Sequence, residues 1–76
     1  MDGMNLARQL AENLRARRGT LTQEAFARKL GISRATLTRL ESAAQNTTIK
    51  TLEQIASALH CSMAELFGEP NPNRRR

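Results

Sequence analysis

The segment from Gln23 to Ser42 constrains the fold most strongly, because its apolar residues form two short stripes at helical spacing. The stripe before the break consists of Phe26, Ala27 and Leu30, and the one after it of Ile32, Leu37 and Leu40. Gly31 separates the two stripes, where a chain that leaves a helix can adopt a left-handed conformation at little cost. The pattern predicts a helix, a tight turn and a second helix.

Small and polar residues at the junctions support this prediction. Thr22 precedes the first stripe and Ser33 the second, and each hydroxyl can accept a hydrogen bond from an amide of the first turn. Glu24 adds a negative charge where it complements the helix dipole. Ala27 carries only a methyl group, which suits a helix that crosses closely and steeply over another. We therefore expect these two helices to pack against each other.

The outward face of the second helix points to a function. If Leu37 faces the core, a rotation of about 100° per residue turns small, hydroxyl and cationic side chains outward: Ala35, Thr38, Arg39 and Ser42. Arg34, at the helix N-terminus, flanks the same outer face and can reach along it. Arginine can bind guanine bidentately, threonine can hydrogen-bond in either sense, and a methyl group can contact the thymine methyl. We predict that these residues read base pairs in a DNA major groove, with Ser42 at the margin.

With these residues in place, the sequence resembles the Cro and phage-repressor helix-turn-helix family, also called the Xre family. The resemblance extends over about residues 10–67 and rests on seven positions at the family's spacing: Gln23, Ala27, Gly31, Ile32, Leu37, Leu40 and Glu41. It implies an all-α fold, a compact bundle of about five helices that forms a lambda-repressor-like DNA-binding domain. It also implies a homodimer that occupies a pseudo-palindromic operator.

The resemblance implies phosphate contacts for residues that flank the outward face. Gln23 is expected to meet a backbone phosphate at a helix N-terminus, which attracts anions, and an ordinary exposed glutamine is the alternative. Ser33 is expected to add a contact. Gln45 and Asn46 could donate from a loop that lacks the glycine, basic residues and proline frequent in the family.

Arg15 corresponds to an arginine that, in the resembled family, pairs with the glutamate closing the second helix of the motif, here Glu41. We expect a structural ion pair between Arg15 and Glu41 that fixes the first helix of the chain on the third. The link between Arg15 and Gln23 is one residue longer than in some members of the family.

Apolar residues recur at helical spacing in three further segments, residues 4–17, 49–59 and 63–67. Thr48 is expected to cap the second of these, and Ser62 with Glu65 forms a capping box for the last. Leu66 and Phe67 have two interpretations, since they could complete the core or form part of a dimer interface, near which the resemblance places the contact between two copies. A dimer could read two half-sites about 34 Å apart.

The composition bounds the size of the protein and the class of its partner. We expect one small domain over residues 1–68 and a disordered basic tail over residues 69–76. The net charge of +5 and the pI of about 11.1 favour a polyanionic partner, although Arg74, Arg75 and Arg76 supply three of the five charges. Two phenylalanines without tryptophan or tyrosine argue against an aromatic platform for single-stranded nucleic acid.

Cys61 and His60 are the only cysteine and histidine of the chain. Their adjacent placement offers no intramolecular disulfide, zinc cluster or catalytic triad, so we expect packing and capping roles for both. We predict no enzymatic activity, no cofactor and no bound metal. No apolar run is long enough to span a membrane and no secretory signal is visible, so we expect a cytoplasmic protein.

These observations predict a bacterial or phage transcription regulator, a repressor that binds specific double-stranded DNA as a homodimer. The alternative from another class is an antitoxin that masks a toxin protein and regulates its own promoter, because antitoxins can use the same domain. A controller of restriction and modification genes is a further alternative. A neighbouring toxin gene, or a methyltransferase or nuclease gene, would distinguish these alternatives.

Overall fold

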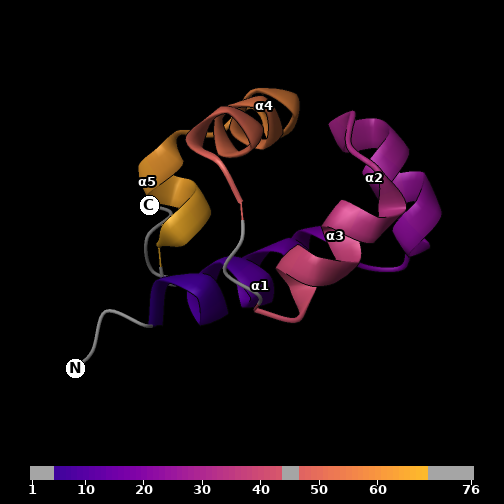
Figure 1. Ribbon diagram of the computed structural model, residues 1–76, viewed down its shortest axis with the longest axis horizontal. Helices are drawn as coiled ribbons and strands as arrows, with labels where there is room; N and C mark the ends of the chain where they lie inside the picture. Colours follow the sequence, from indigo (N-terminus) through magenta and orange to yellow (C-terminus); the bar gives the residue numbers. More distant parts are fainter. Residues whose placement is uncertain (1–4, 44–46, 69–76) are drawn as a thin grey trace.

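The computed structural model of the protein describes residues 5–43 and 47–68 of the 76-residue chain. These ranges contain no strand and five helices, which are α1 (Asn5–Arg18), α2 (Gln23–Leu30), α3 (Arg34–Glu41), α4 (Ile49–Leu59) and α5 (Met63–Phe67). The helices contact one another in a closed ring, because α1 touches α3 and α5, α2 touches α3 and α4, and α4 touches α5 (Figure 1). The prediction of an all-α bundle of about five helices is confirmed.

Short polar side chains set the N-termini of four helices. In each case the side-chain oxygen of the N-cap residue accepts a hydrogen bond from the amide three residues later, and the caps are Thr22, Ser33, Thr48 and Ser62. Such a cap contributes about 1 kcal/mol to stability. The capping box of α5 is complete, since the Glu65 carboxylate also accepts a hydrogen bond from the Ser62 amide at 2.8 Å. All four caps were predicted from the sequence.

Left-handed residues end two of the helices. Gly31 has φ +76° after α2, and the next amide, that of Ile32, donates to the Ala27 carbonyl at 3.0 Å. His60 adopts φ +56° after α4, where the Cys61 amide donates to a carbonyl of that helix's last turn at 3.0 Å. His60 therefore has the capping role that was expected of it, and Cys61 packs half-buried against the core.

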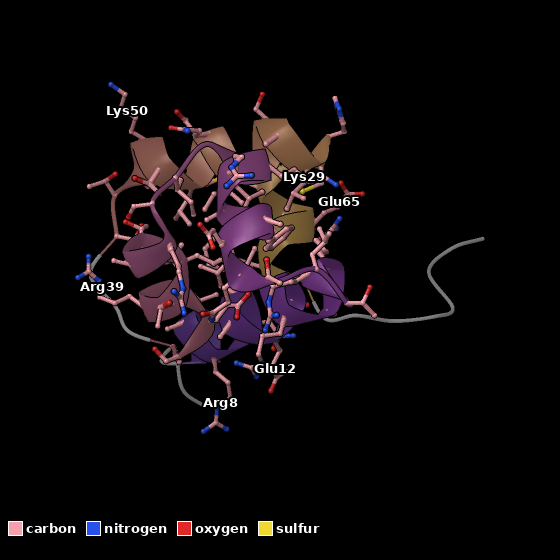
Figure 2. All side chains as sticks on the ribbon, turned by 90° about the vertical axis from the view of Figure 1, so that its right-hand side faces the viewer. Arg8, Glu12, Lys29, Arg39, Lys50 and Glu65 are labelled. Atoms are coloured by element: carbon pink, nitrogen blue, oxygen red, sulfur yellow. The ribbon has the colours of Figure 1, made fainter. Side chains whose placement is uncertain are left out.

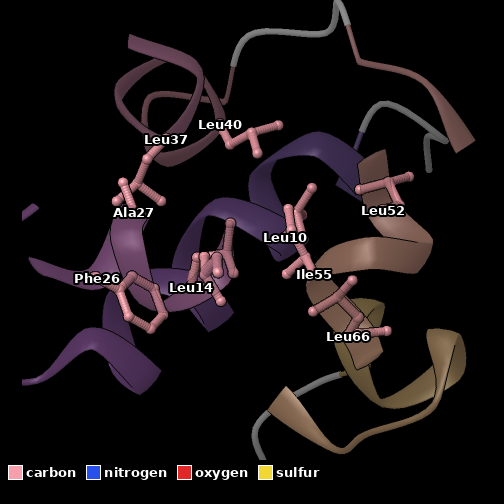
Figure 3. Close-up of a cluster of buried hydrophobic side chains, with 11 residues drawn as sticks. Leu10, Leu14, Phe26, Ala27, Leu37, Leu40, Leu52, Ile55 and Leu66 are labelled. Carbon is pink, nitrogen blue, oxygen red and sulfur yellow. The ribbon is translucent and has the colours of Figure 1, made fainter. Parts of the chain in front are cut away.

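Every helix contributes to one apolar core (Figure 3). Its buried members are Leu10, Leu14, Phe26, Ala27, Leu30, Leu37, Leu40, Leu52, Ile55, Ala56 and Leu66. Leu66 is fully buried in the single chain, so the core interpretation of this residue is confirmed, whereas its assignment to a dimer interface would require the bundle to open. Phe67 is half-buried and packs at the edge of the same core.

A buried asparagine joins the two ends of the described chain. Asn13 of α1 is 5% exposed, and its Nδ2 donates to the Leu66 carbonyl at 2.8 Å and to the Gly68 carbonyl at 2.6 Å. Carbonyl groups at the end of a helix have no partner within the helix, so a side-chain donor satisfies them. Asn13 thereby holds the last turn of α5 against α1. No local pattern in the sequence predicts this role of Asn13.

Candidate nucleic-acid interface

Helix α3 is held by its apolar side and exposes its polar side. Leu37 is 0% and Leu40 2% exposed, and both belong to the buried apolar core (Figure 3). The side chains predicted to read bases are all exposed: Arg34, Ala35, Thr38, Arg39 and Ser42. Figure 2 shows Arg39 extending away from the bundle. We call these five residues the α3 face.

The turn before α3 is fixed by a contact from α4. The Nε2 atom of Gln54 donates to the Gly31 carbonyl at 2.6 Å and to the Leu30 carbonyl at 3.3 Å. These carbonyls close α2, so the contact ties the helix-turn-helix to a helix outside it. The angle at which α3 leaves the turn is therefore supported from two sides, by the core and by α4.

The carboxylate of Glu41 anchors the C-terminal end of α3. Glu41 is 5% exposed, and its two carboxylate oxygens have different partners. Oε2 accepts from Arg18 Nε of α1 at 2.9 Å, and Oε1 accepts from Gln23 Nε2 of α2 at 3.0 Å. One buried carboxylate thus links three helices, and burial is tolerable because the charge is paired and hydrogen-bonded.

The prediction of an ion pair between Arg15 and Glu41 names the wrong arginine. Arg18, one turn beyond Arg15 on α1, makes the ion pair with the Glu41 carboxylate. Arg15 donates through a guanidinium nitrogen to the backbone carbonyl of Glu41 instead. Both arginines therefore bind the end of α3, where cations also complement the helix dipole, but they bind different groups.

Gln23 lies at the first position of α2 and is half-buried between α2 and α3. Besides donating to Glu41, its amide accepts through Oε1 from the Thr38 hydroxyl at 3.2 Å. The side chain is therefore not an ordinary exposed glutamine, which was the alternative interpretation. Its predicted phosphate contact stays a prediction.

The other hydroxyl groups near α3 bond to their own helix. Ser33 Oγ accepts from the Thr36 amide at 3.0 Å and donates to the Thr36 hydroxyl at 2.9 Å. Ser42 Oγ lies within donating distance of the Thr38 carbonyl, at 2.9 Å, and of the Arg39 carbonyl, at 3.1 Å. If Ser33 contacts a phosphate or Ser42 contacts a base, the hydroxyl group must make that contact in addition to these hydrogen bonds or in place of one of them.

Two predicted features lie outside the described residues: the phosphate contacts of the loop residues Gln45 and Asn46, and the basic tail of residues 69–76. Lys50, near the start of α4, is an exposed cation among the described residues (Figure 2). Within the described ranges, no group of histidine, cysteine and acidic residues could hold a metal ion. No helix in those ranges is both long and apolar enough to cross a membrane.

Comparisons with known proteins assign the chain to a family. A family model described as helix-turn-helix matches residues 12–66. The chain is similar to the plasmid copy control protein CopR of Streptococcus agalactiae, with 40% identity over 52 residues, which are 68% of this chain and 56% of that protein. The chain thus spans little more than half the length of this relative. No solved structure matches significantly. The chain belongs to the Cro and phage-repressor type of helix-turn-helix proteins.

Proposed function

We propose that the protein is a repressor that binds a specific pseudo-palindromic operator in double-stranded DNA as a homodimer. The observation that carries this proposal is the α3 face, an exposed helix surface with two arginines and no carboxylate. Glu41, the acidic residue of α3, is buried and ion-paired with Arg18. The surface therefore offers donors and a positive charge to DNA without a repelling acid.

Base reading is assigned to the α3 face and phosphate binding to the residues around it. Arg34 and Arg39 have only donors, which suit the acceptor atoms of guanine in the major groove. Gln23 lies at the N-terminus of α2, where backbone amides and the helix dipole favour an anion. A phosphate beside Gln23 would hold α3 in the groove without reading sequence.

A dimer follows from the small size of the α3 face. An eight-residue helix can contact only a few base pairs, and two copies at half-sites about 34 Å apart multiply the selectivity of one. Phe67, half-buried at the edge of the core, is the candidate for the contact between copies, whereas Leu66 lies inside each copy. Occupancy of the operator would block polymerase.

Selection of DNA fragments bound by the protein tests this proposal. Fragments of the organism's chromosomal and plasmid DNA should be offered at about 150 mM salt, where non-specific phosphate binding is weak. Plasmid DNA is included because the similar CopR is a plasmid copy control protein. We expect one two-fold-symmetric site to be enriched, and the mass of the complex to contain two protein chains.

The matched variants separate recognition from net charge. Arg34→Ala with Arg39→Ala should abolish the enrichment. Arg8→Ala with Lys29→Ala removes the same charge from exposed positions on α1 and α2 (Figure 2) and should keep it. If the folded wild type enriches no site, or if both double variants lose the site equally, the proposal is wrong. An enriched site without symmetry, bound by one chain, would contradict the dimer alone.

A further inference from the structure

A chain of hydrogen bonds connects the buried Glu41 carboxylate to the exposed hydroxyl of Thr38. Gln23 Nε2 donates to Glu41 Oε1 at 3.0 Å, and Gln23 Oε1 accepts from Thr38 Oγ1 at 3.2 Å. The amide of Gln23 therefore stands between a group that anchors α3 and a group on the α3 face. The direction of each hydrogen bond in this chain is fixed by chemistry.

The Glu41 carboxylate determines which group donates in each of these hydrogen bonds. Its carboxylate is ion-paired with Arg18, and an ionised carboxylate can only accept hydrogen bonds. Gln23 must therefore turn its NH₂ group toward Glu41, since its carbonyl oxygen would meet another acceptor there. The opposite end of the planar amide, the oxygen Oε1, consequently faces Thr38.

The orientation of the Gln23 amide in turn makes the Thr38 hydroxyl a donor. An amide oxygen has no hydrogen to donate, so the Thr38 hydroxyl must be the donor of this bond. A hydroxyl has one hydrogen, and it is used inside the protein. Toward solvent, Thr38 then offers an acceptor oxygen and a methyl group, although a free threonine can serve in either sense.

We propose that Glu41, acting through Gln23, sets Thr38 as a hydrogen-bond acceptor and thereby selects a base with an amino group in the major groove. These bases are adenine, through N6, and cytosine, through N4, whereas the major-groove edge of guanine offers only acceptors and thymine offers an acceptor beside its methyl. This inference rests on the proposed function. It makes Gln23 a specificity-determining residue that acts through Thr38.

The arrangement complements the rest of the α3 face. Arg34 and Arg39 can only donate, so they select acceptors on the bases. The oriented Thr38 hydroxyl supplies a sequence-reading acceptor close to these donors. A face that combines both senses can discriminate more base pairs than a face that carries donors alone.

Selection from operators randomised at each base pair tests this inference, with Thr38→Val as the first variant. Valine keeps the shape and a methyl group of threonine but removes the hydroxyl. Every Watson–Crick pair has one amino group in the major groove, so the base is defined on the strand that Thr38 faces. We expect one position in each half-site at which the wild type prefers adenine or cytosine on that strand, by roughly tenfold for one neutral hydrogen bond. This preference should disappear in Thr38→Val. A thymine preference that arises from methyl contact would survive the same substitution.

Gln23→Met is the second variant, and it tests the role of the relay itself. Methionine is similar in length but neither donates nor accepts strongly, so the Thr38 hydroxyl would regain both senses. We expect the ratio of amino-bearing to other bases at the Thr38 position to fall toward one. A lost phosphate contact or a lower stability would weaken all sequences alike and leave this ratio unchanged. Glu24→Gln, a change at the exposed neighbouring residue, should keep the wild-type ratio.

Two results would overturn the inference. One is a preference, removed by Thr38→Val, that stays unchanged when 2-aminopurine replaces the adenine or pyrimidin-2-one replaces the cytosine of the preferred pair, because both analogues lack the major-groove amino group. The other is an unchanged base ratio in Gln23→Met. Failure of the proposed function has a different signature, because a wild-type protein that selects no sequence at all would remove the base preferences of every position.

Discussion

Replacing Arg18 by methionine should destabilise the fold, because it leaves the Glu41 carboxylate buried without its cation. The Glu41 side chain is 4% exposed and the Arg18 side chain 25% exposed. Removing one partner of a fully buried pair costs about 3 to 5 kcal/mol, and an exposed pair contributes about 0 to 1. This pair lies between the two cases, because Glu41 is buried and Arg18 is partly exposed. Gln23 also keeps its hydrogen bond to Glu41 in the variant. We therefore expect the free energy of unfolding to fall by about 2 kcal/mol. For a domain of this size that loss lowers Tm by about 8 to 16 °C.

Arg15→Met is the matched comparison, since it removes the same group one turn earlier on α1. Its acceptor is the Glu41 backbone carbonyl and the side chain is exposed, so we expect a loss of about 0.5 to 1.5 kcal/mol. Methionine in both variants keeps much of the aliphatic stem, which separates the loss of charge from the loss of packing.

The free energy of unfolding is measured by urea and thermal unfolding, followed by circular dichroism. Each arginine variant is measured alone and in combination with Glu41→Gln. The double-mutant cycle should show coupling between Glu41→Gln and Arg18→Met, because both change the same ion pair. Coupling with Arg15→Met should be small, because glutamine retains the backbone carbonyl that Arg15 binds. A larger loss for Arg15→Met, with coupling to Glu41→Gln, would refute the assignment and restore Arg15 as the partner of the carboxylate.

Two further predictions concern stability and are measured by the same unfolding experiments. Asn13→Ala should cost about 1 to 3 kcal/mol, because it strips donors from the carbonyls that end α5. Gln9→Ala removes only a 3.5 Å hydrogen bond to the Gly68 carbonyl, so it should lower the free energy of unfolding by less. Equal losses of stability in the two variants would show that Asn13 has no special role. Gly31→Ala should destabilise more than Gly19→Ala. Both glycines have positive φ, but only at Gly31 would a Cβ meet the Gln54 amide, at 2.6 Å. The difference between the two alanine variants should shrink in a Gln54→Ala background, and a constant difference would exclude this contact as its cause.

The helices were predictable because their signals are local. A hydroxyl at an N-cap accepts from an amide three residues away, so Thr48 and Ser62 mark their helices whatever the rest of the chain does. The α3 face was predictable for a similar reason, since burial of Leu37 fixes the direction of every other side chain on that helix.

The residues that were missed depend on contacts between distant segments. Arg15 and Arg18 are separated by about one turn of α1, and only the crossing of α1 with α3 decides which reaches the carboxylate. The resemblance to the family indicated that an arginine of the first helix pairs with Glu41. The link before Gln23, one residue longer than in some members, was the one sequence signal that a different arginine makes this pair. Asn13 meets carbonyls 53 and 55 residues away, for which no local pattern exists.

Glu41 connects the stability of the bundle with the chemistry of the α3 face. Its carboxylate is held by α1 and at the same time orients Gln23, so a substitution at Glu41 changes the stability and the direction of the Thr38 hydroxyl together. Gln23 can be changed with the ion pair left in place, which makes it the position where the two effects separate. Gln23→Met should lower the stability only by the loss of one hydrogen bond to Glu41. A change of base preference in this variant would mean that the preference of Thr38 is set outside α3, the helix proposed to contact DNA.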